Sequence, residues 1–384
     1  MMKRTIELFC LCGALLLASP LAAEETPTIT VSKGDRINLT VASLGGAEGA
    51  TATKTLQNDL TLSGFFVLGG ANAVYTASGT AGGGSLQGRV ADHSGGTVLS
   101  KTYSGSTREN AHQFADDIIE TLTGNKGIAG SKISFIATRS GHKEVYVADY
   151  DGSNVRQMTH DGVISVHPSI SPDGRKIAYT GYQSGYADVY VIDLASGARS
   201  RVANYPGTNS GASFSPDGGR LALTISKDGN PELYTISAGG GGARRLSRTH
   251  GVESGPTWSP NGDEIIYSSD DRGSPQLYRI SASGGGGQMI SAGHTYCTEP
   301  SWSPDGKKIA FNVRSGGEFQ IAVMDVQGGG SHIVTSGQNP VWGPDSRHII
   351  AAQDGALYLT DTVTSRKNKI LDGLGKITEP SWSR

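Results

Sequence analysis

The four tryptophans of this chain all occupy one position of a repeated phrase, which reads Trp-Ser-Pro-Asp-Gly at 302–306. That position falls at Ile170, Phe214, Trp258, Trp302, Trp342 and Trp382, in steps of 44, 44, 44, 40 and 40 residues. A second marker has the same period, because Tyr146, Tyr190, Tyr234 and Tyr278 are each 44 residues apart. Two markers in phase indicate a structural repeat, and this period is typical of the four-stranded blades of a β-propeller.

Each repeat predicts four strands. The phrase ends the first strand in a tight turn, because Pro presets φ and Asp-Gly tolerates the turn geometry. A short apolar strand follows, as at 176–179, then the tyrosine strand, as at 188–192, and after a glycine turn a fourth strand, as at 331–334. The tryptophans are expected in the middle of the innermost strand, where an aromatic side chain wedges between neighbouring blades.

Five units are complete in sequence, starting at 168, 212, 256, 300 and 340, and a sixth is split. Residues 131–166 supply its second to fourth strands, and Pro380-Ser381-Trp382-Ser383 supplies a first strand with nothing after it. Joining the two closes the ring and leaves no unpaired sheet edge. The sequence therefore predicts a mainly β protein: a six-bladed β-propeller over 131–384, whose C-terminal strand closes the first blade.

Residues 24–130 lack the repeat and predict a small N-terminal α/β domain. Apolar residues at helical spacing indicate a helix that ends at Ser63-Gly64, and a longer helix with Thr107 as N-cap and Gly124 as its stop. Short strands are expected at 37–41, 65–68, 89–90 and 98–103.

Residues 1–23 have the features of a secretory signal peptide. The start is basic, with Lys3 and Arg4, an apolar run covers 8–17, and small residues precede position 24. The run is too short to span a bilayer. We therefore expect an exported protein that is not inserted in the membrane, with Cys297 as its one cysteine and no intrachain disulfide.

Two segments of the N-terminal domain resemble the TolB family, the periplasmic propeller subunits of the Tol–Pal envelope system of Gram-negative bacteria. Residues 59–66 are similar to the family's Asp-Leu-x-x-Ser-Gly-x-Phe, and residues 108–128 to its Arg-x-x-Ala-His-x-x-Ala-Asp-x-Ile-x-x-x-Leu-Thr-Gly-x-x-Gly element. With the six blades, the resemblance covers essentially the whole mature chain. The stretch between Phe66 and Arg89 is short and Gly-rich, which predicts that a segment usual in the family is missing here.

The resemblance implies a periplasmic adaptor, monomeric on its own, that supports outer-membrane integrity and constriction during cell division. It implies two partners: the peptidoglycan-associated lipoprotein Pal, bound by the propeller, and the inner-membrane protein TolA, bound by the mature N-terminus. The expected TolA segment is Glu24, Glu25, Thr26, Pro27, Thr28, Ile29 and Thr30. The expected Pal contacts, in loops that enter the innermost strands, are Thr208, Asn209, Gly211, Ser254, His294, Tyr296 and Glu299. For His294 and Tyr296, partner contact and simple loop packing both remain open.

Other chemistry has little support in the sequence. A hydrolase with an appended propeller needs Gly-x-Ser-x-Gly, and no serine of this chain has glycine at both −2 and +2. Residues 149–154 resemble a calcium loop, but Asn154 stands where that loop needs glycine, so a hairpin turn is favoured. His112 is interpreted as a boundary or capping residue rather than a ligand.

We therefore expect no enzyme activity, no cofactor and no metal site. The net charge of −2 gives no reason to expect nucleic acid as a partner. The alternative that remains is a periplasmic propeller that binds a glycan or another small ligand in its channel.

Overall fold

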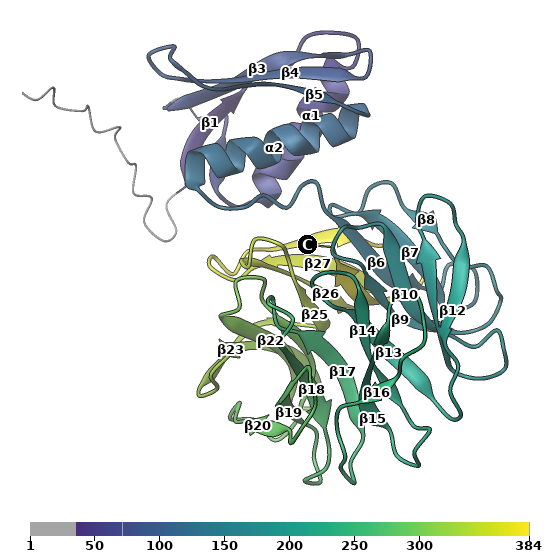
Figure 1. Ribbon diagram of the computed structural model, residues 1–384. Coiled ribbons are helices and arrows are strands. Elements are labelled where there is room, and N and C mark those ends of the chain that lie inside the picture. The colour runs from purple at the N-terminus through teal and green to yellow at the C-terminus, as the bar shows by residue number, and fades with distance from the viewer. Residues whose placement is uncertain (1–35, 71, 384) are drawn as a thin grey trace, which may run out of the picture.

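The computed structural model describes residues 36–70 and 72–383, and within them a small α/β domain lies against a ring of six sheets (Figure 1). Each sheet of the ring has four strands, so the predicted six-bladed propeller with an N-terminal α/β region is confirmed. The predicted signal peptide at 1–23 and the predicted TolA segment at 24–30 lie outside the described residues.

The N-terminal region is a five-stranded sheet with two helices on the side that faces the propeller (Figure 1). The sheet order is β2 (Phe66–Leu68), β1 (Ile37–Val41), β3 (Tyr75–Gly82), β4 (Ser85–Asp92) and β5 (Thr97–Ser104). Strand β1 pairs in parallel with β2 and β3, and the remaining pairs are antiparallel. Helices α1 (Gly49–Leu62) and α2 (Thr107–Thr123) share one apolar core with the sheet.

The prediction of Thr107 as the N-cap of α2 was wrong by one residue. Ser106 is the N-cap: its backbone is extended, and its hydroxyl accepts a hydrogen bond from the Glu109 N–H at 3.3 Å. The Glu109 carboxylate accepts the Ser106 N–H at 3.0 Å in return, so the two residues form a capping box. Gly124 ends the helix in the left-handed conformation, as predicted.

The Gly-rich stretch after Phe66 contains a strand, β3, that the sequence did not predict, and β4 is longer than the predicted 89–90. The glycines are required by close packing. A Cβ on Gly79 would lie 2.2 Å from the carbonyl oxygen of Gln87, and one on Gly88 would lie 2.7 Å from the Phe114 ring. The low hydrophobicity of this hairpin therefore reflects tight backbone approach rather than a loop.

Five blades are consecutive in sequence, and their strands are given from the channel outward. Blade two is β9 (Ser165–Ile170), β10 (Lys176–Gly181), β11 (Asp188–Asp193) and β12 (Arg199–Ala203). Blade three is β13 (Asn209–Phe214), β14 (Arg220–Ile225), β15 (Glu232–Ser237) and β16 (Arg244–Arg245). Blade four is β17 (Glu253–Trp258), β18 (Glu264–Ser269), β19 (Gln276–Ser281) and β20 (Gln288–Ile290). Blade five is β21 (Cys297–Trp302), β22 (Lys308–Ser315), β23 (Glu318–Asp325) and β24 (Ser331–Ser336). Blade six is β25 (Gln338–Trp342), β26 (His348–Gln353), β27 (Ala356–Asp361) and β28 (Lys367–Leu371).

Blade one is assembled from both ends of the propeller sequence. Its strands are β29 (Ile377–Trp382), β6 (Lys132–Ala137), β7 (Glu144–Asp149) and β8 (Arg156–Gln157), with β29 innermost. The Ser383 hydroxyl accepts the Lys132 N–H at 2.9 Å, across 251 residues of sequence. The predicted closure by the C-terminal strand is therefore what the structure shows.

The repeated phrase forms the same turn in successive blades. In blade two the Ser171 hydroxyl donates to Asp173 at 2.6 Å and accepts the Lys176 N–H, which opens β10, at 2.9 Å. Gly174 completes the turn with a φ of +67°. Ser215, Ser259 and Ser303 repeat the arrangement. The phrase is thus a hydrogen-bonded unit that starts the second strand of the blade.

The tryptophans wedge between blades, as predicted, but each ends its innermost strand instead of lying in the middle of it. Trp258 of blade four donates from Nε1 to the Ser213 carbonyl of blade three at 3.0 Å. Trp382 of blade one donates to the Ser131 hydroxyl at 2.6 Å, on the connection that leaves the N-terminal domain. Both side chains are buried, so they fix the contact between neighbouring units.

Candidate partner-binding site

One backbone position of every innermost strand has a left-handed conformation. The six residues are His167, Gly211, Gly255, Glu299, Asn339 and Glu379, with φ between +51° and +65°. Each lies at a bulge where the pairing with the second strand shifts register. All six line one end of the channel, where they surround a cavity of about 160 Å³. We call this ring of six residues the mouth.

The mouth is asymmetric. Gly211 and Gly255 leave one side without side chains, and no heavy atom lies within 4 Å of a Cβ built on Gly211. On the other side Glu379 accepts the His167 N–H at 2.6 Å, and His167 Nδ1 lies 3.3 Å from the Ser210 hydroxyl. The mouth therefore has two carboxylates, Glu299 and Glu379, and an open part at Gly211 and Gly255, with the Glu299 carboxylate next to Gly255.

The Glu299 carboxyl is the most perturbed group of the mouth. Burial raises its pKa and the negative charge of Glu379 raises it further, while interactions with His167 and Asn339 oppose the rise. A cationic group placed here would relieve the repulsion between the two carboxylates. The mouth is therefore suited to a positively charged side chain.

The structure places only two of the predicted Pal contacts, Gly211 and Glu299, at the mouth itself. Thr208 is exposed in the loop before β13, and Ser254 is half-buried in β17. Asn209 is buried: its side chain donates to the carbonyls of Tyr205 at 2.8 Å and Ala187 at 3.2 Å, and accepts the Tyr205 N–H. Asn209 thus holds the 205–209 loop in shape, and any effect on a partner is exerted through that loop.

His294 and Tyr296 are both tied to neighbouring side chains. His294 Nε2 lies 2.9 Å from the Ser331 hydroxyl, and its ring stands edge-on to Phe311. The Tyr296 ring lies 6.1 Å from the Phe319 ring, on the β22–β23 hairpin. Both are half-buried, so loop packing accounts for them at least in part.

Four residues of the mouth were missed from the sequence: His167, Gly255, Asn339 and Glu379. A signal for them exists, because each mouth residue stands three positions before the aromatic or apolar position of its repeat. The repeat therefore marks a ring of channel-facing positions, which this chain fills with His, Gly, Glu and Asn.

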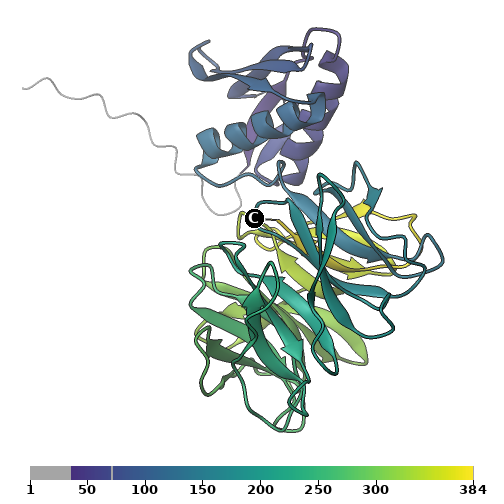
Figure 2. The same ribbon diagram turned by 45° about the vertical axis from the view of Figure 1, so that its right-hand side comes forward.

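The N-terminal domain packs against the opposite end of the ring, near the turns that follow the tryptophans. A crevice there is lined by Asp116 and Lys126 of that domain and its linker, and by Asp173, Pro344 and Ser383 of the propeller. In Figure 2 the domain lies on one end of the ring only. The mouth therefore remains free of the N-terminal domain.

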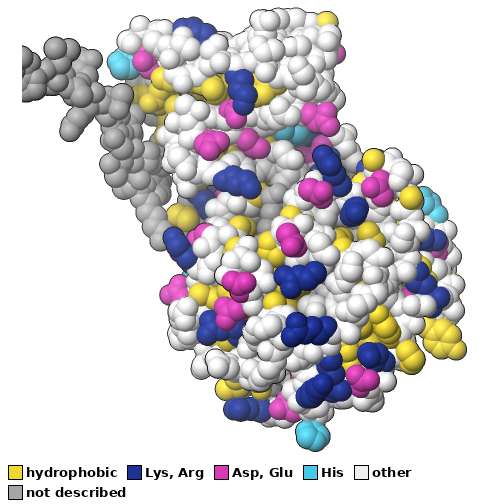
Figure 3. Space-filling view, viewed as in Figure 1, with side chains coloured by type: hydrophobic (Ala, Val, Ile, Leu, Met, Phe, Trp, Pro, Cys, Tyr) yellow, Lys and Arg dark blue, Asp and Glu magenta, His cyan; other side chains and the backbone are white. Residues whose placement is uncertain are grey.

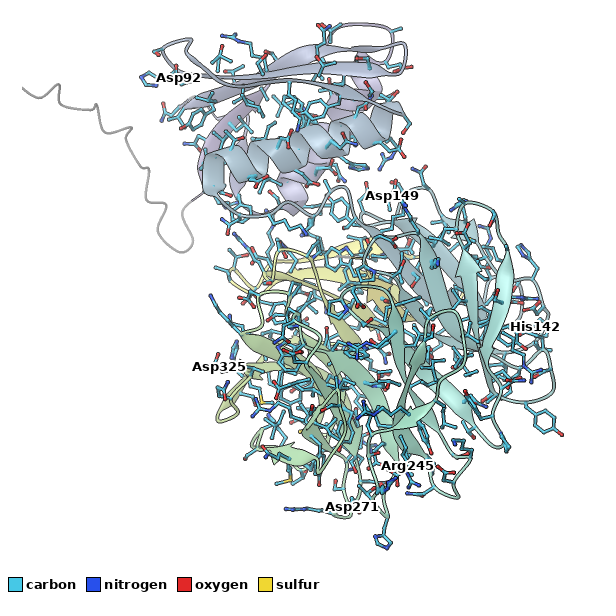
Figure 4. The ribbon with its side chains drawn as sticks, in the orientation of Figure 1. Asp92, His142, Asp149, Arg245, Asp271 and Asp325 are labelled. Atoms are coloured by element: carbon cyan, nitrogen blue, oxygen red, sulfur yellow. The ribbon has the colours of Figure 1, made fainter. Side chains whose placement is uncertain are left out.

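A buried polar cluster joins the two domains, and we call it the latch. On the helices, His112 Nδ1 lies 2.7 Å from Asp59, and Asp59 also accepts the Tyr150 hydroxyl of the propeller at 2.9 Å. Arg108 donates to Asp151 at 2.9 Å and lies 3.7 Å from Asp149. Asp149 is labelled in Figure 4, directly beneath α2. The hypothesis that His112 is a boundary residue is thus supported by its place between the domains.

The latch is highly charged for a buried site. Burial alone would lower the pKa of His112, but hydrogen bonds to Asp149 and Asp59 and the charge of Asp59 raise it to about 9. Burial raises the pKa of Asp59, so this carboxylate depends on His112 and Tyr150 to stay ionised. Burial would also raise the pKa of Asp149, yet His112, Lys132 and Asn154 hold it at about 2.

The residues 149–154 form the hairpin turn that the sequence favoured over a calcium loop. Gly152 has a φ of +81°, and the acids of the turn are engaged by Asn154, Lys132 and Arg108. Within residues 36–70 and 72–383 no group of three or more His, Cys, Asp or Glu side chains is arranged to hold a metal ion. The same residues include no helix that is both long and apolar enough for a membrane span.

The surface and Cys297 show little sign of other chemistry. Basic and acidic side chains are interspersed over the face seen in Figure 3, without a large area of one sign. The Cys297 thiol is buried, and burial raises its pKa to about 12. A thiol with so high a pKa has little nucleophilic character at neutral pH.

Comparison with known proteins resolves the family. A model of the "TolB beta propeller domain" matches residues 119–384, well over half of the chain. The chain belongs to the TolB family. A TolB structure from Acinetobacter baumannii aligns with a TM-score of 0.82, at 24% identity, over 92% of this chain and 98% of that one, and so has the same fold.

Two curated TolB relatives match shorter parts of the chain. The Protein TolB homolog of Chlorobaculum tepidum is 42% identical over 91 residues, which are 23% of this chain and 21% of the relative. The Tol-Pal system protein TolB of Geobacter sulfurreducens is 42% identical over 82 residues, 21% of this chain and 19% of the relative. The matched part thus spans about a fifth of the length of these TolB proteins.

Proposed function

We propose that this TolB-family chain is an adaptor of the Tol–Pal system in the periplasm. Its propeller mouth would bind a Pal-like outer-membrane lipoprotein, and residues 24–30 would bind a TolA-like inner-membrane protein. The adaptor would support outer-membrane integrity and constriction during division, without enzyme activity. The observation that carries the proposal is the open mouth, on the end of the propeller that the N-terminal domain leaves free.

The shape of the mouth favours a protein partner over a small ligand. Pockets for small molecules have volumes of roughly 300–1,000 Å³, and the cavity at the mouth has about 160 Å³. Binding loops on a rigid scaffold are a common way to recognise another protein. A glycan held in the channel is therefore the weaker alternative.

Substitution of Gly211 tests the proposal at the mouth. Gly211→Arg places a long cationic side chain in the open space at the mouth, since no heavy atom lies within 4 Å of the Cβ position of Gly211. Gly211→Ala is the matched control, because both variants place a side chain at a φ of +65° and have the same backbone strain. Binding of the purified Pal domain is measured by calorimetric titration, and the melting temperature reports folding.

The arginine variant should weaken Pal binding by at least about tenfold, which is about 1.4 kcal/mol, whereas the alanine variant should bind nearly as the parent does. The ring already accepts side chains at the same φ in His167, Glu299, Asn339 and Glu379, so both variants should fold. Equal affinity of the arginine variant and the parent, at equal stability, would place the Pal site elsewhere.

A further inference from the structure

Three large apolar side chains are exposed together on blade two, beside the mouth. Tyr186 is 71% exposed, Ile164 51% and Tyr182 39%. The Tyr182 N–H donates to the Ile164 carbonyl at 3.1 Å, which continues the antiparallel pairing of β9 and β10. Residues opposite each other in such a pair have their side chains on the same face. We call Ile164, Tyr182 and Tyr186 the tyrosine rim.

The turn that carries the two tyrosines of the rim is fixed by polar contacts. Gly185 N–H donates to the Tyr182 carbonyl at 2.9 Å, which closes the turn between the two tyrosines. The Ser184 hydroxyl hydrogen-bonds to Asp188, a buried carboxylate that also pairs with Arg201 at 2.6 Å. A turn whose backbone is already fixed loses less conformational entropy on binding, which favours it as the base of an interface.

The tyrosine rim is continuous with the mouth. Ile164 is followed after two residues by His167, the mouth residue whose N–H is bound by Glu379. The exposed Lys143 borders the rim on the side away from the channel. Its carbonyl accepts the N–H of Ser165, the residue after Ile164, at 2.9 Å. A partner that covers the rim therefore meets negative charge toward the channel and positive charge away from it.

We propose that the tyrosine rim is a docking surface for the protein that binds at the mouth. The partner seats an apolar side chain against Ile164 and the two tyrosine rings, and directs a lysine or arginine toward Glu379. This inference rests on the proposed function and adds the chemistry of the partner. A protein is favoured over a sugar, because the Ile164 methyl groups offer no hydrogen bond, while tyrosine beside aliphatic surface is typical of protein interfaces.

The test uses the mature chain and the soluble domain of the cognate Pal-like lipoprotein, with affinity measured by calorimetry at two salt concentrations. Tyr186→Ser and Ile164→Ser remove apolar surface from exposed positions, so the fold should be unaffected. Met289→Ser is the matched control, since Met289 is 43% exposed on the outer strand of blade four, away from the rim. Glu379→Gln removes the charge and keeps an acceptor for the His167 N–H.

Each rim variant should weaken binding about tenfold, and Met289→Ser should stay within about twofold of the parent chain. Glu379→Gln should weaken binding about threefold and reduce its salt dependence, because a charge pair is lost. If the parent binds and both rim variants bind equally well, the rim proposal is wrong while the proposed function stands. If the parent does not bind the lipoprotein at all, the proposed function itself fails.

Two further outcomes would also overturn the rim proposal. If light scattering shows that the parent is a dimer and Tyr186→Ser a monomer, the rim is covered by a second copy of this chain. If sedimentation with purified peptidoglycan depends on the tyrosines while lipoprotein binding does not, the rim recognises a sugar.

Discussion

Replacing His112 by glutamine should remove a pH-dependent part of the stability of the domain junction. Glutamine keeps a donor for Asp59 but has no proton to lose or gain. The pKa of His112 rises from an ordinary 6.5 to about 9 in the folded chain. A rise of this size corresponds to at most about 3.5 kcal/mol of folding free energy, at about 1.4 kcal/mol for each pKa unit.

The direction of the effect follows from the sign of that rise. A group whose pKa is higher in the folded state stabilises it fully below the unfolded pKa, and loses this contribution as pH rises through the folded pKa. The parent chain should therefore exceed His112→Gln in free energy of unfolding by up to about 3 kcal/mol near pH 6. The difference should fall steadily between pH 6.5 and 9 and level off above pH 9.

Denaturant unfolding followed by near-ultraviolet circular dichroism, at steps of one pH unit, measures this difference. His332→Gln is the control for loss of a histidine, because His332 is exposed on β24, far from the latch. A difference that stays constant from pH 6 to 10 would refute the reasoning. It would mean that His112 is neutral, with Nδ1 donating to Asp59 and Nε2 accepting from Arg108, which lies 3.3 Å away.

Two further predictions concern the ends of the chain. Deletion of 378–384 removes most of the innermost strand of blade one, including the buried Trp382, and leaves β6 as a free sheet edge. The melting temperature should therefore drop by at least about 10 °C. A drop of only about one or two degrees would contradict the closure of blade one by the C-terminal strand. Deletion of 24–30 should leave the melting temperature unchanged and abolish binding to a TolA domain, as checked by calorimetry, and retained binding would remove the proposed role of that segment.

The propeller could be predicted from the sequence because the motif that defines each blade is short and recurs in every repeat. The Ser-Pro-Asp-Gly turn is built from hydrogen bonds within six residues, and each copy confirms the others. Strand β3 was missed because its hairpin with β4 is rich in glycine. Gly79 and Gly88 are required by the close approach of Gln87 and Phe114, and a pattern of neighbouring residues in the sequence does not indicate such contacts. The N-cap was placed one residue too late because Ser106 and Thr107 are both common N-cap residues; Ser106 is the more favoured type, and the glutamate three residues after it completes the capping box.

The candidate site could be predicted only in part, for a related reason. The fold and the period locate the loops at the mouth, and Gly211 and Glu299 do lie there. Asn209 looks like an exposed loop residue in the sequence, yet it turns inward to bind two carbonyls. The latch brings together Asp59, His112 and Tyr150, whose pairing depends on how two domains meet and has no signature in either segment alone.

The closing strand has a consequence for the order in which the molecule can be made. Strand β6 is synthesised early, but its inner neighbour β29 is among the last residues of the chain. Until those residues emerge, blade one has an open inner edge and the ring of blades has a gap. A chain that lacks β29 therefore exposes the unpaired inner edge of β6. Long-range closure of this kind is slow compared with local hairpin formation. A chain with this topology therefore completes blade one only after β29 has been synthesised.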